Sequence, residues 1–142
     1  MHRSKVIIAA FAFALSLASC ATTATVGANF SSGVLTDKAG MTLYTFDKDT
    51  ENSGKSVCNG NCANNWPPLA ASVNDKPGGF WSIVTRDDGS LQWAYKGKPA
   101  YRWNKDQKPG DMTGDGFGNS WRIVKEDLQA SAPRDRERSN AY

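Results

Sequence analysis

Tyr44-Thr-Phe-Asp-Lys-Asp49 and Tyr101-Arg-Trp-Asn-Lys-Asp106 are two copies of one pattern in this 142-residue chain. Each copy has a tyrosine, any residue, an aromatic residue, two further residues and an aspartate. A glycine stands four positions before each tyrosine, and a tryptophan, Trp66 or Trp121, follows each copy. Because internal repeats reveal how a chain is assembled, the pattern predicts a domain built from two related units. The residues that define it are Tyr44, Phe46, Asp49, Tyr101, Trp103 and Asp106.

The aromatic residues of the motif alternate as they would in a β-strand. Tyr44 and Phe46 are two positions apart, so they share one face of a strand. Tyr101 and Trp103 have the same spacing. A polar residue stands between the two aromatic residues in both copies, which indicates that the aromatic face is the buried one.

Further short apolar runs surround the two copies, and turn signals separate them. Asp37-Lys-Ala-Gly40 and Asp88-Gly89 are typical of tight turns. No window has the spacing and caps of an amphipathic helix of ordinary length. We therefore expect a small all-β domain over residues 33–124, an antiparallel meander of short hairpins with strands near 34–36, 41–46, 80–85, 91–95, 100–103 and 120–124.

Residues 1–19 have the anatomy of a secretory signal peptide. They contain a short basic head, an apolar run at 6–17 that is too short to span a bilayer, and small residues at the end. The tetrapeptide that ends at Cys20 resembles a bacterial lipobox, whose cysteine is acylated and becomes the first mature residue. We expect residues 20–32 to form a tether, or in part a first edge strand, between this lipid and the domain. The alternative is an ordinary signal peptide that happens to contain a cysteine.

The N-terminal end of the mature chain predicts where the protein is attached, and the C-terminal end predicts a disordered tail. Acyl chains on Cys20 would hold the protein at a membrane surface. The residue after this cysteine is Ala21 and not an aspartate. In Gram-negative lipoproteins this favours attachment at the periplasmic face of the outer membrane. Residues 125–142 are charged and weakly apolar, a composition typical of a disordered tail.

Charge balance and histidine content exclude several classes of function. The chain has 17 Lys and Arg residues against 14 Asp and Glu residues, and Arg3 and Lys5 lie in the signal peptide. The mature chain is therefore near neutral and lacks the dense basic patch that nucleic-acid binding requires. The single histidine, His2, also leaves with the signal peptide, which removes the commonest general base and metal ligand. We expect no enzymatic activity, no cofactor and no nucleic-acid partner.

Cys58 and Cys62 lie close together in a stretch rich in asparagine and glycine. In an exported protein two such thiols most often form a disulfide. The alternatives are a redox dithiol or a soft-metal site, which would handle copper or transfer electrons. The two-residue spacer of thioredoxin-like dithiols is absent, and so is the Cys-x-x-Cys-His pattern of haem attachment. A structural disulfide is the favoured interpretation.

The acidic residues have a structural and a chemical interpretation. Asp49 and Asp106 would accept backbone N–H bonds where the chain leaves a strand. Two carboxyl groups about 5 to 9.5 Å apart could instead act as acid and base of a hydrolase, but a repeated architecture explains repeated aspartates better. A calcium ion in a loop is a further hypothesis, although the spacing departs from that of the EF-hand. Its weak candidate ligands are Asp47, Asp49, Glu51, Asp111 and Asp115.

Two aromatic residues fall outside the strand alternation. Trp66 precedes two prolines, and Phe117 lies in a glycine-rich stretch. Because exposed apolar patches mark interaction sites, we expect these two side chains to contribute to a surface that binds a ligand, such as the sugar rings of a cell-wall glycan.

The doubled motif resembles a family of bacterial lipoproteins that is named for it and is also called the secreted repeat family of unknown function. The resemblance rests on the six motif residues, on Cys58-x-x-x-Cys62-Ala63 leading to Trp66-Pro67-Pro68, and on the lipobox at Cys20. It covers about residues 33–124. The second copy departs from the first, because it has no cysteine pair and has Trp121-Arg-Ile in place of Trp66-Pro-Pro. The resemblance implies an exported repeat domain and supplies no activity.

Together these features predict a lipid-anchored, exported, non-catalytic binding or scaffolding module. Its expected partners are the membrane, through the lipid, and a glycan or a protein of the cell envelope. The alternative function is a copper-handling or electron-transfer accessory that uses Cys58 and Cys62.

Overall fold

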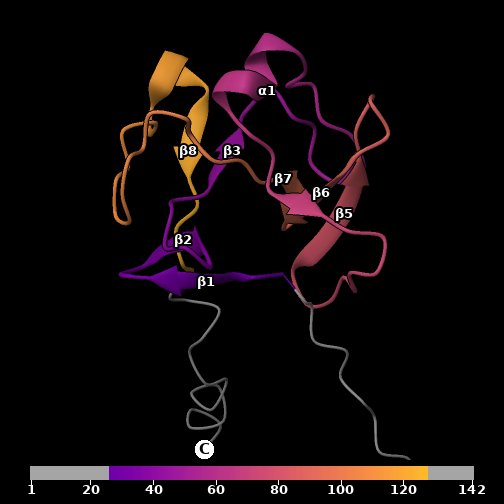
Figure 1. The fold of residues 1–142 in the computed structure, drawn as a ribbon, viewed down its shortest axis with the longest axis horizontal. Coiled ribbons are helices and arrows are strands. Elements are labelled where there is room, and N and C mark those ends of the chain that lie inside the picture. The colour runs from indigo at the N-terminus through magenta and orange to yellow at the C-terminus, as the bar shows by residue number, and fades with distance from the viewer. Residues whose placement is uncertain (1–25, 128–142) are drawn as a thin grey trace, which may run out of the picture.

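The computed structural model describes residues 26–127. In this part of the chain short strands alternate with turns, and helix is confined to one segment of five residues and one of three. In chain order (Figure 1) the elements are β1 (Ala28–Ser31), β2 (Val34–Asp37), β3 (Tyr44–Phe46), α1 (Asn61–Asn65), β4 (Ala70–Ala71), β5 (Trp81–Thr85), β6 (Leu91–Tyr95), β7 (Lys98–Pro99), η1 (Phe117–Asn119) and β8 (Trp121–Ile123).

The strands form three small antiparallel sheets. β1 pairs with β2, β3 pairs with β8, and β6 lies between β4 and β5 and also pairs with β7. The neighbours on both sides of β6 explain why its three central residues are all buried, including the polar Gln92. The predicted all-β class is confirmed. Sequential hairpins account for β1–β2 and β5–β6–β7, whereas β3 and β4 find their partners far along the chain.

The two motif segments have exchanged partners between the repeats, although the second copy, expected as a strand at 100–103, pairs only through a bridge at Tyr101. β3 of the first repeat pairs with β8, which contains the tryptophan of the second repeat, so that Phe46 lies opposite Trp121. Reciprocally, Tyr101 of the second repeat bridges to Pro68, just after the tryptophan of the first. The N–H of Arg102 donates a 2.8 Å hydrogen bond to the carbonyl of Pro67 in the same segment. Each repeat is therefore completed by a segment of the other.

A backbone bridge between Tyr44 and Tyr101 lies at the centre of this exchange. Each residue donates its N–H to the carbonyl of the other, at 2.8 and 2.9 Å. The pattern around the bridge repeats: Leu43 donates to Leu35 at 2.9 Å, and Ala100 donates to the equivalent Trp93 at 2.9 Å. The two related units inferred from the sequence are thus arranged about an approximate two-fold axis.

Two hydrophobic clusters form the core. The first consists of the motif side chains and the buried cysteine, namely Tyr44, Cys58, Trp66, Tyr101, Trp103 and Trp121. The second is more aliphatic and holds the sheets around β6 together, with Leu35, Leu43, Leu69, Trp93 and Ala100. Burial of the large aromatic residues removes on the order of 150–250 Å² each from water, which is how a short chain with few long strands obtains a stable core.

The ordered domain extends beyond residues 33–124 at both ends. Residues 28–31 of the expected tether form β1, an edge strand, because they pair in register with β2. At the other end Lys125 bridges to Val34, and the N–H of Glu126 donates to the carbonyl of Gly33 at 2.9 Å. The predicted signal peptide, Cys20 and most of the predicted tail lie outside the described residues. Within residues 26–127 no helix is long and apolar enough to cross a membrane.

Candidate functional site

The six motif residues meet in the first core cluster, where each tyrosine binds the aspartate of the other repeat. The hydroxyl of Tyr44 donates to Asp106 Oδ2 at 2.6 Å, and the hydroxyl of Tyr101 donates to Asp49 Oδ2 at 2.6 Å. Both carboxylates are buried: Asp49 is 1% exposed and Asp106 is 8% exposed. The motif therefore encodes a reciprocal buried hydrogen bond that joins the two units.

The second carboxylate oxygen of each motif aspartate organises its own loop. Asp49 Oδ1 accepts the N–H of Val57 at 2.8 Å, and Asp106 Oδ1 accepts the N–H and the hydroxyl of Thr113 at 3.0 and 2.7 Å. Both oxygens of each carboxylate thus have partners, as the structural interpretation of the sequence predicts. Burial, and next the carboxylate beside each hydroxyl, raise the pKa of Tyr44 and of Tyr101 well above the ordinary 10.0.

Four aromatic rings stack in one column. They are the second aromatic residue of each motif copy and the tryptophan that follows each copy, namely Phe46, Trp66, Trp103 and Trp121. Trp66 and Trp121 are at its centre, with ring centroids 3.7 Å apart and planes 4° from parallel. Trp103 stacks on the outer side of Trp66 at 4.0 Å, and Phe46 on the outer side of Trp121 at 4.3 Å. Each repeat contributes one central and one terminal ring, so the column follows the same approximate two-fold axis.

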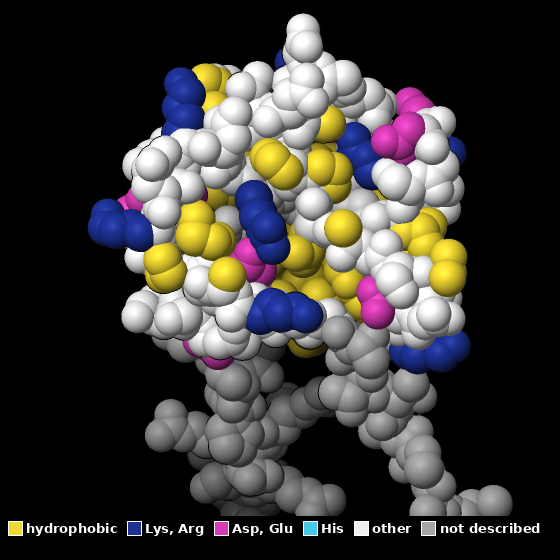
Figure 2. Space-filling view, in the orientation of Figure 1, with side chains coloured by type: hydrophobic (Ala, Val, Ile, Leu, Met, Phe, Trp, Pro, Cys, Tyr) yellow, Lys and Arg dark blue, Asp and Glu magenta, His cyan; other side chains and the backbone are white. Residues whose placement is uncertain are grey.

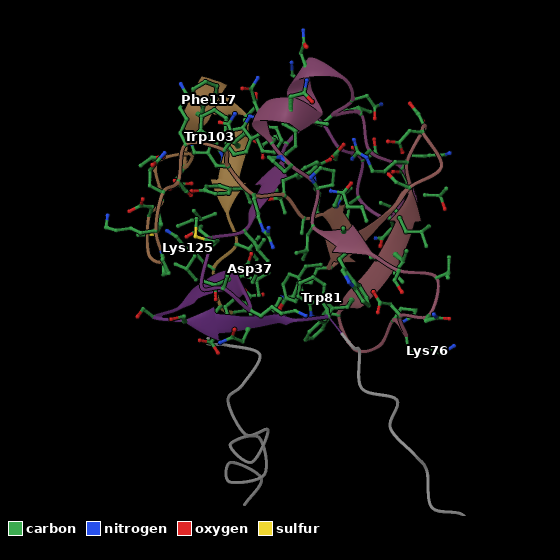
Figure 3. All side chains as sticks on the ribbon, viewed as in Figure 1. Asp37, Lys76, Trp81, Trp103, Phe117 and Lys125 are labelled. Carbon is green, nitrogen blue, oxygen red and sulfur yellow. A yellow bond between two sulfur atoms is a disulfide. The ribbon has the colours of Figure 1, made fainter. Side chains whose placement is uncertain are left out.

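The two residues expected on a ligand-binding surface, Trp66 and Phe117, differ in their exposure. Trp66 is 3% exposed, so its expected place on a ligand surface is wrong: Trp103 and Trp121, two rings of the second repeat, stack on its faces. Phe117 is 49% exposed and leans on Trp103 at 4.8 Å. It lies at the outer edge of the column (Figure 3). Of the two, only Phe117 can touch a ligand from solvent.

Cys58 and Cys62 form a disulfide, as the sequence predicts. Cys58 is fully buried and belongs to the motif cluster. The alternative of a copper or electron-transfer site needs free thiolates, whereas the two sulfurs are bonded to each other. In the second repeat Gly114 occupies the corresponding place against Tyr44 and Trp66. A Cβ there would lie 2.7 Å from Trp66 Cη2, so a cysteine at this position would overlap the ring.

A buried arginine that the sequence did not single out supports the disulfide loop. Arg86 is 4% exposed, and its guanidinium donates to Cys58 O and Gln92 Oε1 at 2.6 Å each. It also donates to Ser56 Oγ at 3.0 Å, and Ser56 is hydrogen-bonded to the hydroxyl of Tyr101. The guanidinium therefore links β5 and β6 to the Tyr101–Asp49 pair. Arg86 follows the strand that begins at Trp81, but no sequence pattern reveals that it turns inward.

The candidate calcium ligands do not come together. Asp49 is used by Tyr101 and Val57, Asp47 faces Arg122 at 3.2 Å, and Asp111 faces Lys108 at 2.7 Å. Asp115 accepts the N–H of Ile123 at 3.0 Å, and Glu51 lies exposed before β4. Among residues 26–127 no three histidine, cysteine or acidic side chains are grouped as a metal site would require.

A cavity on another face combines charged side chains with an apolar floor. It has a volume of about 240 Å³ and lies between the end of β2, the segment that leads into β4, and β6. Figure 2 shows the hollow, with a hydrophobic floor and side chains of both charges at its rim. Asp37, labelled in Figure 3, lies at its edge. The floor includes Pro68, Leu69 and Trp93, and the charged side chains are Asp37, Lys38, Asp75 and Arg102. We call it the Asp37–Arg102 cavity.

Asp37 is held rigidly in this cavity. It is 2% exposed, and its Oδ1 accepts the N–H groups of Ala39 and Met41 at 2.8 and 3.0 Å, which fixes the turn after β2. Its Oδ2 lies 2.6 Å from Arg102 Nη2, but no N–H is directed at it well enough to form a hydrogen bond.

The sequence predicts Asp37 in a turn and Arg102 on the face away from the aromatic residues, and the structure has both there. It did not reveal that they meet, because the contact depends on the exchange of partners between the repeats. The side chain of Arg102 is 47% exposed, so one charged group of the cavity remains in reach of solvent. Among the described residues, Asp37 Oδ2 is the buried side-chain atom that has an ion-pair contact but no well-directed hydrogen bond.

Comparison with known proteins identifies the family of the chain but not its activity. A family described as a secreted repeat of unknown function matches residues 30–70 and 82–125. These two ranges coincide with the two structural units, and together they cover more than half of the chain. No curated protein and no solved structure matches it. The chain belongs to the family of secreted repeats of unknown function.

Proposed function

We propose that this exported protein is a lipid-anchored binding module that holds a neutral sugar unit of a cell-envelope glycan in the Asp37–Arg102 cavity. One observation carries the proposal: a guanidinium that a buried carboxylate holds in place stays half exposed beside an apolar floor. Binding sites characteristically combine an apolar lining with a few fixed polar groups.

The chemistry of the cavity suits a sugar ring. Hydroxyl groups both donate and accept, so neighbouring hydroxyls can accept from Arg102 and Lys38 and donate to the half-buried Asp75. The C–H face of a pyranose can pack on Leu69 and Trp93, which line the floor. A volume of about 240 Å³ is below the roughly 300–1,000 Å³ of drug-sized pockets. A single ring, and not an extended chain, is the unit we expect inside.

The charge of the cavity favours a neutral ligand. Asp37 and Asp75 oppose Lys38 and Arg102 in its lining. An anionic or cationic ligand would meet like charges at close range, and like charges destabilise a bound ion in a partly buried site. A ligand without net charge gains hydrogen bonds to both signs and meets no repulsion.

The proposal includes anchoring and excludes catalysis. Acylation of Cys20 would attach the module to the periplasmic face of the outer membrane. The motif carboxylates are engaged in the fold, since Asp49 and Asp106 each bind a tyrosine and the N–H groups of their loops. A general acid or base must reach the proton that it transfers, and neither of these buried groups is placed to do so.

Calorimetric titration with neutral cell-wall saccharides, from single rings to short fragments, tests the proposal. We expect saturable binding that Arg102→Leu weakens at least tenfold, because it removes the guanidinium that Asp37 holds at the cavity. Arg122→Leu is the matched control: its side chain is also about half exposed, at 43%, but lies outside the cavity. Absence of heat with every saccharide, or equal affinity of the two variants, would overturn the proposal and favour a protein partner.

A further inference from the structure

Exposed apolar side chains occur in the loop that joins β4 to β5. Val73 is 84% exposed and Phe80 is 60% exposed. Phe80 is the last residue before β5, and its ring meets Tyr95 edge-on at 6.1 Å. The Nζ of Lys96 lies 5.0 Å from the centre of the Phe80 ring. An aromatic side chain in water, next to an ammonium group, is typical of surfaces that contact the interfacial region of a membrane.

This loop is close to the point at which the described chain begins. Phe30 of β1 also meets Tyr95 edge-on, at 6.0 Å, so β1 and Phe80 flank the same ring. Figure 1 shows the start of β1 beside the lower end of β5, and Figure 3 places Trp81 and Lys76 at this end of the molecule. Phe117, the other exposed phenylalanine, lies at the opposite end in Figure 3.

The length of chain between the lipid and the domain limits the distance to the membrane. Val26 follows Cys20 by six residues, and six residues span at most about 20 Å when fully extended. With Cys20 acylated, the end of the domain that contains Val26 must therefore remain within about 20 Å of the bilayer surface. Phe80 lies at that end, whereas Phe117 does not.

We propose that the loop at residues 72–80 is a membrane-docking surface, on which Phe80 inserts into the interfacial region of the bilayer that holds the lipid anchor. Val73 adds apolar area from the same loop, and Lys96, which is paired with Asp127, lies against the Phe80 ring. Stable attachment commonly combines a lipid with a second signal. This inference rests on the lipid anchor of the proposed function but not on its sugar site.

Depth-dependent fluorescence quenching tests the orientation. The acylated protein is prepared with an environment-sensitive label at Phe80→Cys or, as the matched control, at Phe117→Cys. Each is bound to phosphatidylethanolamine–phosphatidylglycerol vesicles that contain spin-labelled lipids. We expect severalfold stronger quenching at position 80 than at position 117. Equal quenching at the two positions would overturn the docking surface.

Flotation of the same samples separates the two levels of the proposal. Protein that floats with the vesicles confirms the anchor, so that the quenching result then reports on docking alone. Protein that does not float would overturn the anchor and the docking surface together, and would leave the sugar titration as an independent result. Thermal melting of both labelled variants confirms that each retains the fold, since both labels replace exposed side chains.

Discussion

Tyr44 donates a hydrogen bond of 2.6 Å to Asp106, so the tyrosine of the first repeat is bound to the aspartate of the second. The converse bond, from Tyr101 to Asp49, has the same length. Neither repeat can satisfy its own motif, because each carboxylate is buried beside the other repeat's hydroxyl. This exchange explains why the pattern occurs twice in one chain: one copy alone would leave a buried carboxylate and a buried phenol without partners, at a cost of about 1–3 kcal/mol each or more.

The exchange predicts strong energetic coupling between Tyr44 and Asp106. Tyr44→Phe removes the hydroxyl and should lower the free energy of unfolding by about 1–3 kcal/mol, because Asp106 loses a buried donor. Asp106→Asn should cost a similar amount. Since both changes break one bond, the double variant should cost clearly less than the sum. Urea unfolding of the four proteins measures the coupling, and strictly additive losses would contradict it.

The raised pKa of both tyrosines predicts a loss of stability at alkaline pH. In the unfolded chain each phenol loses its proton near 10.0, whereas burial and a neighbouring carboxylate keep it protonated in the fold. Above pH 10 the unfolded state therefore binds fewer protons than the folded state, and the free energy of unfolding falls as pH rises. The fall is about 1.4 kcal/mol per pH unit for each tyrosine.

Urea unfolding between pH 9 and pH 11.5 measures this slope. Tyr101→Phe should be less stable than the parent protein, because a hydrogen bond is missing. The tyrosine-dependent fall in its free energy of unfolding per pH unit should, however, be only about half as steep. An unchanged slope in this variant would show that the two buried phenols do not control the alkaline transition. Below pH 9 the stabilities of the variant and the parent protein should run in parallel, because neither Tyr44 nor Tyr101 titrates there.

Gly114 is predicted to tolerate no side chain. A Cβ at this position would lie 2.7 Å from Trp66 Cη2 and 3.0 Å from Tyr44 Cε1, in the middle of the aromatic cluster. Gly114→Ala should therefore cost about 1–3 kcal/mol through overpacking and lower the melting temperature by several degrees. Thermal melting followed by near-ultraviolet circular dichroism reports both the stability and the ring packing. A melting temperature equal to that of the parent protein would contradict the close contact.

Arg86 is predicted to be irreplaceable by lysine. Its guanidinium reaches Cys58 O, Gln92 Oε1 and Ser56 Oγ at once, and an ammonium group cannot reproduce that planar fork. Arg86→Lys should lower the free energy of unfolding by about 2 kcal/mol or more, because buried acceptors lose their donor. Arg122→Lys, on the surface, should change it by less than about 0.5 kcal/mol. Equal effects of the two substitutions would contradict the structural role of Arg86.

The local part of the fold could be predicted from the sequence. Alternation located β6 at residues 91–95, and the parity of the motif identified Tyr44, Tyr101 and Trp103 as buried. The disulfide followed from the spacing and the compartment. These features depend on neighbours in the chain, so a single sequence contains the information.

The tertiary part could not be predicted in the same way. Pairing of Phe46 with Trp121 and of Tyr101 with Pro68 joins residues far apart, and repeat symmetry alone permits each unit to close on itself. Burial of Trp66 depends on that exchange, because the rings that stack on it, Trp103 and Trp121, both come from the second repeat. The Asp37–Arg102 cavity was missed for the same reason: it forms only when β2 and the segment around Arg102 are brought together.

The sugar site is the central functional claim, and an amide chemical-shift titration tests it most directly. The N–H groups of Ala39 and Met41 report on Asp37, because they donate to its Oδ1. Addition of a neutral cell-wall saccharide should shift these two resonances and that of Leu69 in a saturable way, and should leave Phe117 unchanged. Shifts centred on Phe117, or no shift at saturating saccharide, would contradict the assignment of the Asp37–Arg102 cavity as the binding site.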